Sequence, residues 1–127
     1  MHHAINPSPP VLNTIILYAR DVQRSATFYA TYFGFEAMEK STDGMQALTN
    51  PAGGTGLLIH QAAKSVKLGQ AGVKLSFSVQ NVETFVAEAA NKGLKFGAIH
   101  QANGYQFANT KDPDKNSVSV SSRAFRR

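Results

Sequence analysis

Few side chains in this chain of 127 residues could ligate a metal or act as a nucleophile. The absence of cysteine excludes disulfides, thiolate zinc sites and cysteine nucleophiles. Besides His2 and His3, the histidines are His60 and His100, and each follows a short apolar stretch. We interpret these two as strand-end or loop residues, because no carboxylate shares their predicted strand face to complete a metal site. No Ser-His-Asp arrangement, acid pair or glycine-rich phosphate loop has local support, so we predict no catalytic residue and no cofactor.

The composition is typical of an ordinary globular domain. Hydrophobic residues make up 43% and charged residues 17%, and no apolar run approaches the ~18 residues of a membrane span. The net charge of +5 comes from scattered lysines and arginines, whereas nucleic-acid surfaces concentrate basic residues in a stripe. Residues 1–10 lack the pattern of a secretory signal. We therefore predict a cytoplasmic protein with neither a nucleic-acid nor a membrane partner.

An internal repeat predicts the order of the structural elements. In residues 13–22 and 73–82, two sets of side chains alternate, which predicts a strand in each range. Asp21 and Asn81 come directly after or close to the end of these predicted strands. These two residues are good helix N-caps, because a side-chain oxygen can accept hydrogen bonds from free backbone N–H groups. Apolar residues then recur at helical spacing until Gly34 and Gly93, where each helix is expected to end.

The later part of each repeat predicts further strands. Short extended stretches at residues 45–49 and 105–110 precede turns at Pro51 and Pro113, and each turn leads into another strand. Each half therefore has a strand, a helix and about three more strands, so the fold class is α+β with two βαβββ units. We place repeat 1 at about residues 11–62 and repeat 2 at about 71–122. The remaining segments are an N-terminal extension (1–10), a polar linker (61–71) and a basic tail (123–127).

Two motifs in these repeats resemble those of a known superfamily. Residues 18–36 read YARDVQRSATFYATYFGFE, and residues 111–120 read KDPDKNSVSV. They resemble the strand-to-helix signature and the D-P-D-G-N turn of the vicinal oxygen chelate superfamily, which includes glyoxalase I, bleomycin-resistance proteins and extradiol dioxygenases. The resemblance covers about residues 11–122 and implies a curled sheet forming a cup, with helices outside. It implies a fold rather than a reaction, because the cup holds a metal in some members and an organic ligand in others.

The family's metal positions distinguish between these two kinds of member. They correspond here to Thr14, Lys74 and Ser119, with a fourth position near Leu57. Divalent metals prefer imidazole and carboxylate ligands, and a lysine ammonium repels a cation and has no free lone pair. We therefore predict no metal site and favour a protein that is not an enzyme. One alternative is a metal-dependent glyoxalase-like lyase, dioxygenase or thiol transferase whose metal site is misaligned.

Strand alternation assigns the side chains that face the cup. They combine aromatic rings with small hydroxyls, which is typical of sites for organic molecules, although an open sheet face in contact with water could look similar. Lys74 either extends to the rim or pairs with an anionic ligand group. A further alternative is a metal-independent enzyme that uses Lys74, or Tyr18 with Tyr105, as acid or base. The predicted ligand-binding residues are Thr14, Ile16, Tyr18, Lys74, Ser76, Ser78, Tyr105, Phe107, Asn109, Ser117 and Ser119.

We therefore predict a metal-free protein, resembling the glyoxalase and bleomycin-resistance group, that binds or sequesters a small organic molecule. Drug-binding resistance proteins are the family precedent for this role. A planar aromatic ligand, neutral or anionic, suits the aromatic cup residues and the positive net charge. We also predict a homodimer, because the helix stripe with Tyr29, Tyr32 and Phe33 offers more aromatic surface than one helix–sheet contact needs. Each cup could close within one chain or be shared across the dimer.

Overall fold

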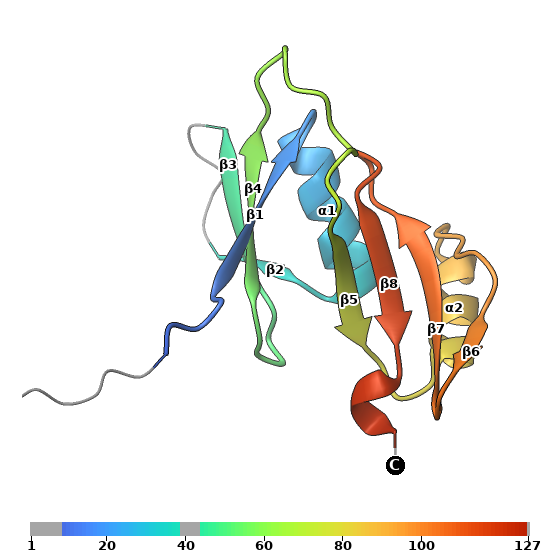
Figure 1. The fold of residues 1–127 in the computed structure, drawn as a ribbon. Helices are drawn as coiled ribbons and strands as arrows, with labels where there is room; N and C mark the ends of the chain where they lie inside the picture. Colours follow the sequence, from blue (N-terminus) through green and yellow to red (C-terminus); the bar gives the residue numbers. More distant parts are fainter. Residues whose placement is uncertain (1–8, 39–43, 127) are drawn as a thin grey trace, which may run out of the picture.

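The computed structural model describes residues 9–38 and 44–126, which form two four-stranded sheets with one helix packed on each. Figure 1 shows the sheets side by side, with helix α1 behind the gap between them and helix α2 behind the second sheet. This arrangement confirms the predicted α+β class and the two βαβββ units. His2, His3 and most of the predicted N-terminal extension lie outside the described residues.

Each unit forms its own mixed sheet. The first contains β1 (Thr14–Ala19), α1 (Val22–Phe33), β2 (Glu36–Ala37), β3 (Met45–Thr49) and β4 (Gly56–Gln61). The second contains β5 (Lys74–Ser78), α2 (Val82–Asn91), β6 (His100–Ala102), β7 (Tyr105–Lys111) and β8 (Ser117–Ser121). The strand orders are β1-β4-β3-β2 and β5-β8-β7-β6, so β1 and β5 are edge strands that each pair in parallel with the last strand of their unit.

The helices begin and end where the repeat predicts. The side chains of Asp21 and Asn81 each accept a hydrogen bond from the backbone N–H three residues later, at 3.1 and 2.9 Å. These bonds satisfy donors that the first turn of a helix leaves free. Helix α1 ends at Gly34, whose φ of 73° is the left-handed conformation that glycine adopts without strain. Helix α2 ends just before Gly93, which has a φ of 104°.

The predicted division of each strand into two sides is also observed. The helix-facing side chains form the core, in which Ile59, Val118 and Val120 have no measurable exposure and Leu75 is buried. Leu17 and Phe77 are half-buried against the same core. Burial of these apolar side chains is the main contribution to the stability of the fold.

Contacts of α1 hold the two units together. The Tyr29 hydroxyl donates a 2.7 Å hydrogen bond to the Asp112 carboxylate, and both residues are buried. The Phe33 ring stacks on Phe77 with a centroid distance of 4.3 Å, and the Tyr32 hydroxyl donates to the second unit at the Lys92 carbonyl. The aromatic stripe of α1 is thus largely used within the chain, so the homodimer stays a prediction without the support of this stripe.

The linker between the units is also packed against the body of the protein. The Arg20 guanidinium donates hydrogen bonds to the linker carbonyls of Ala63 and Val66, at 3.1 and 2.5 Å. The Asp114 carboxylate accepts from the Arg20 backbone N–H at 3.1 Å and from the Ser25 hydroxyl at 3.0 Å. The start of α1, the linker and the turn between β7 and β8 therefore meet at one end of the molecule.

The described part of the predicted basic tail, residues 123–126, lies next to the second sheet. It forms a short 3-10 helix, η1 (Arg123–Phe125), that contacts β7. The Arg126 guanidinium carbon lies 5.9 Å from the centre of the Tyr105 ring, which is within the range of a cation–π contact. Of the helices in residues 9–38 and 44–126, none has the length and apolar character required to cross a membrane.

Candidate ligand-binding site

The side of the second sheet that faces away from the helices carries most of the predicted ligand-binding residues, and we call it the basic face. The strand register arranges these residues in rows across β5, β8 and β7, and paired residues point to the same side of a sheet. The first row is Lys74, Ser117 and Lys111, the second is Ser76, Ser119 and Asn109, and the third is Ser78, Ser121 and Phe107, with His100 of β6 beside Phe107. The face therefore changes from basic, through hydroxyl and amide groups, to aromatic.

The two lysines of the basic face hydrogen-bond to neutral oxygen atoms. The Lys74 ammonium donates to the Asn109 side-chain oxygen at 3.0 Å, and the Lys111 ammonium donates to the Ser117 hydroxyl at 3.0 Å. Lys74 Nζ also lies 5.9 Å from the centre of the Phe107 ring. Lys74 therefore points across the sheet towards the aromatic end rather than out from the rim.

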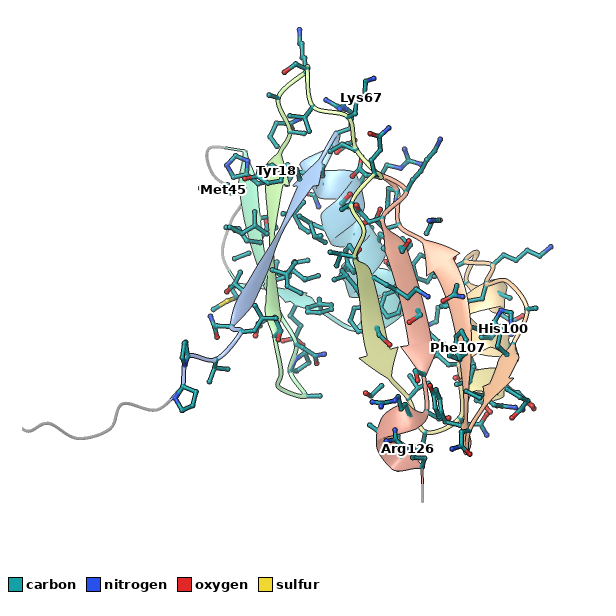
Figure 2. The ribbon with its side chains drawn as sticks, in the orientation of Figure 1. Tyr18, Met45, Lys67, His100, Phe107 and Arg126 are labelled. Carbon is teal, nitrogen blue, oxygen red and sulfur yellow. The ribbon has the colours of Figure 1, made fainter. Side chains whose placement is uncertain are left out.

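The aromatic end of the basic face is a cluster of rings. His100 stacks on Phe107 with a centroid distance of 5.0 Å, and Tyr105 lies 6.4 Å from Phe107. Figure 2 shows His100 and Phe107 together on the second sheet, with Arg126 at the end of the chain below it. Such rings offer apolar area on which a planar ligand can stack.

The first sheet presents a different surface on its corresponding side, which we call the apolar face. It carries the predicted residues Thr14, Ile16 and Tyr18, and the register places Leu58 and His60 beside the last two. Ile16 is 50% and Tyr18 49% exposed, and the Tyr18 ring lies 5.3 Å from the His60 ring. Figure 2 shows Tyr18 on the first sheet and Phe107 on the second, on either side of the gap between the sheets.

The predicted site residues are thus divided between two sheets. Tyr18 lies on β1 and Tyr105 on β7 of the other sheet, and no hydrogen bond or ring contact joins the two within the described residues. Within the part of the chain that the structure describes, β1 and β5 do not pair with each other. The eleven residues form two separate surfaces within one chain.

A cleft of about 870 Å³ opens between the two units. Among the predicted ligand-binding residues, it is lined by Lys74, Ser76 and Ser78. Phe33, Phe77 and Phe85 also line it, and the Phe33 ring lies 4.3 Å from Phe77 and 5.8 Å from Phe85.

These three aromatic residues have the spacing of core residues on their strand or helix. Phe33 comes from α1 of the first unit, whereas Phe77 and Phe85 come from β5 and α2 of the second. Only the packing of α1 between the units brings them together. No local sequence signal could have revealed this lining, because it depends on contacts between distant segments.

The positions that correspond to the family's metal ligands do not suit a metal. Thr14, Lys74 and Ser119 lie on strands β1, β5 and β8 and offer neither imidazole nor carboxylate. The fourth position was predicted near Leu57, but Leu57 pairs with Ile15 and is buried on the helix side. Leu58 is the neighbour on the open side, so the repeat alignment was off by one residue there. Within residues 9–38 and 44–126, no group of three or more His, Cys, Asp or Glu could hold a metal ion.

The described carboxylates lie away from the basic face. Asp112 and Asp114 come one and three residues after Lys111 in the chain, but their side chains accept hydrogen bonds from Tyr29 and Ser25 of α1. The others lie on α1's cap, on β2 or on α2: Asp21, Glu36, Glu83 and Glu88. Lysine charge on the basic face therefore has no carboxylate partner among the described residues.

Comparison with known proteins places the sequence in a family. Residues 11–120 match the sequence profile described as the Glyoxalase/Bleomycin resistance protein/Dioxygenase superfamily. No curated protein matches the chain.

Solved structures with a similar fold include proteins of different stated roles. A lactoylglutathione lyase from Agrobacterium tumefaciens is 20% identical, with 90% of this chain and 94% of that chain covered and a TM-score of 0.70. TnmS3, described as an antibiotic binding protein from Streptomyces sp. CB03234, is 17% identical, with 94% and 97% covered and a TM-score of 0.72. The virulence protein STM3117 from Salmonella typhimurium is 20% identical, with 91% and 98% covered and a TM-score of 0.72. At these identities the likeness shows the fold alone.

Proposed function

We propose that this chain, which belongs to the Glyoxalase/Bleomycin resistance protein/Dioxygenase superfamily, binds a small aromatic molecule on its basic face without metal-dependent catalysis. The observation that carries the proposal is the combination of stacked rings, serine hydroxyls and lysine ammonium groups on one open sheet face. Sites for organic molecules combine apolar contact area with a few polar groups that fix orientation.

Sequestration is the role that this site chemistry favours. The similar fold of TnmS3, described as an antibiotic binding protein, supports the idea that such sheets can hold an organic compound. Thr14, Lys74 and Ser119 offer no set of metal ligands, so the corresponding positions lend no support to a metal-dependent lyase, dioxygenase or transferase.

The second wall of the cup is proposed to come from another copy of the chain. Ile16 and Tyr18 leave apolar area open to solvent on the apolar face, and exposed apolar patches often mark interaction sites. A two-fold pair that sets the apolar face of one protomer opposite the basic face of its partner would be self-complementary and closed. It would form two equivalent cups, each with one apolar and one basic wall.

The dimer is tested by sedimentation at micromolar concentration. We expect a dimer for the native chain and a shift towards monomer for Ile16→Asp, because a charge would be buried against the partner. Ser65→Asp, at an exposed linker position, adds the same single negative charge and is the control for charge alone. A native chain that sediments as a monomer would contradict the shared cup.

The binding function is tested with a panel of small aromatic compounds, followed by thermal melting and native mass spectrometry. A compound present at a hundred times its Kd should stabilise the native state by about 2.7 kcal/mol. Phe107→Ala should weaken binding about tenfold, since removing a buried aromatic contact costs about 1–3 kcal/mol. Phe125→Ala removes an exposed ring from η1 and is the matched control.

Metal analysis separates this proposal from the enzymatic alternative. We expect far less than one equivalent of zinc, nickel, manganese or iron in the purified protein, and no change in melting temperature after treatment with a chelator. A stoichiometric metal whose removal lowers the melting temperature would favour the metal-dependent enzyme instead.

A further inference from the structure

The basic face carries positive charge that no carboxylate of residues 9–38 and 44–126 neutralises. Lys74 and Lys111 occupy the two ends of one row, with Ser117 between them. Because adjacent strands lie about 4.8 Å apart, their backbones are separated by roughly 10 Å. Both side chains reach inward, the Lys111 ammonium to Ser117 of β8 and the Lys74 ammonium to Asn109 in the next row, so an acidic group of a ligand placed over β8 would lie near both ammonium groups.

Lys74 is held across the sheet by its hydrogen bond to Asn109. β8 separates β5 from β7, so a side chain that begins on β5 and reaches Asn109 on β7 must pass over β8. Ser119 lies on β8 in the row of Asn109 and is only 3% exposed. The Lys74 ammonium is thus fixed above the middle of the basic face.

The acceptor of this bond is a neutral amide oxygen at 3.0 Å. The bond already has a charged donor, but its neutral acceptor leaves the ammonium charge uncompensated, whereas an anion at the same place adds the attraction between two opposite charges. An anionic ligand would therefore be a better partner for Lys74 than Asn109 is. Asn109 positions the lysine when the site is empty and can release it without leaving a buried charge.

The aromatic end of the face defines the rest of the ligand. Lys74 Nζ lies 5.9 Å from the centre of the Phe107 ring, which stacks on His100. A planar ring stacked on Phe107 would bring its substituents within reach of that ammonium. A cationic ligand would be repelled by Lys74 and Lys111, and an aliphatic acid would not use the rings.

From this geometry we infer that the ligand is an aromatic acid, whose anionic group takes the place of Asn109 as the partner of Lys74. The inference rests on the proposed binding function and specifies its ligand class. Lys74 is the specificity-determining residue, and Asn109 is a positioning residue that acts through it.

The test compares 2-naphthoate with its neutral analogue 2-naphthamide by fluorescence anisotropy, in a protein that contains no tryptophan to interfere. We expect the native chain to bind 2-naphthoate about tenfold more tightly than 2-naphthamide, because the acid forms an ion pair with the Lys74 ammonium whereas the amide offers it only a neutral oxygen. Lys74→Met should abolish this preference. Asn109→Asp, which is nearly isosteric, should abolish it too, because the new carboxylate pairs with Lys74 and repels the ligand acid.

Matched controls separate this charge effect from general electrostatics. Lys64→Met removes the same charge from the exposed linker and should leave the preference unchanged. In Asn109→Asp, 2-naphthamide should bind as it does to the native chain, which distinguishes repulsion of the acid from damage to the site.

The outcomes distinguish failure of this inference from failure of the binding function. Equal affinity of the native chain for the two compounds would overturn the aromatic acid while leaving aromatic binding intact. A preference that survives Lys74→Met would overturn the role of Lys74. No binding of either compound at millimolar concentration would overturn both the aromatic acid and the proposed aromatic site.

Discussion

The hydroxyl of Tyr29 offers a sharp test of how the two units are held together. Tyr29→Phe removes one oxygen atom and with it the 2.7 Å hydrogen bond to the Asp112 carboxylate. Tyr29 is 0% and Asp112 5% exposed, so water cannot readily replace the missing donor. A hydrogen bond to a charged group contributes about 1.5–3 kcal/mol. Asp112 keeps three donors from Asp114 and Asn116, so we expect a loss near the middle of this range, about 2 kcal/mol.

The assay is urea unfolding at neutral pH, followed by circular dichroism. Tyr32→Phe is the matched control, because the Tyr32 hydroxyl lies at the surface and donates to the neutral Lys92 carbonyl. A bond between neutral groups contributes about 0.5–1.5 kcal/mol, and surface exposure places this one at the lower end. If Tyr29→Phe costs no more than Tyr32→Phe, the contact between α1 and the β7–β8 turn does not stabilise the fold as argued.

The same hydroxyl should make the free energy of unfolding decrease at alkaline pH. Burial raises the pKa of Tyr29 well above its usual range, and the nearby negative charges of Asp112 and Asp114 raise it further. The folded chain therefore holds this proton more tightly than the unfolded chain. The stabilisation that the protonated Tyr29 hydroxyl gives the fold is complete below about pH 10, the pKa of tyrosine in the unfolded chain. This stabilisation is lost as the pH rises beyond that value. Between about pH 9 and about pH 11, the native chain should lose more stability than Tyr29→Phe.

Four substitutions test the turns and the two sides of the sheets in the same urea assay. Lys115 has a φ of 69°, so Lys115→Gly should stabilise the fold by about 1 kcal/mol through relief of left-handed strain. Gly69 has a φ of 76° and an added Cβ would lie 2.8 Å from Lys115 Cβ, so Gly69→Ala should destabilise by about 1–3 kcal/mol. Phe77→Ala should cost about 2–4 kcal/mol because the ring stacks on Phe33, whereas Phe107→Ala on the open side should cost less than about 1 kcal/mol. The reverse order for the two phenylalanines would mean that the sides of the strands are wrongly assigned.

The parts of the fold that depend on local signals could be predicted from the sequence. Asp21 and Asn81 mark both helix starts because an N-cap acts through backbone groups only a few residues away. Strand sides follow from alternation, and the open side of β5 and β8 is as expected, although Ser119 on it is buried. These features need no knowledge of how distant segments pack.

Features that depend on contacts between the units were missed or misread. Tyr29 and Phe33 fit a helix stripe that could face a partner, but α1 packs them against the second unit. Asp112 was interpreted as a turn residue, and nothing local indicates that its carboxylate also accepts from Tyr29, far away in the sequence. The one-residue error near Leu57 arose because the loop before β4 (residues 50–55) is one residue longer than the loop before β8 (residues 112–116).

The hydrogen bond between Tyr29 and Asp112, which joins the two units, is linked through the chain to the basic face. Asp112 directly follows Lys111 of β7, and its carboxylate binds the Asn116 backbone N–H just before Ser117 of β8. The buried carboxylate thus sets the start of the row that carries both lysines of the basic face, and Tyr29 of the first unit holds that carboxylate in place. A ligand site built from residues of the second unit therefore depends for its geometry on a helix of the first. For this reason Tyr29→Phe should weaken binding of 2-naphthoate as well as stability, even though Tyr29 lies on the helix side of the sheet and touches no residue of the basic face.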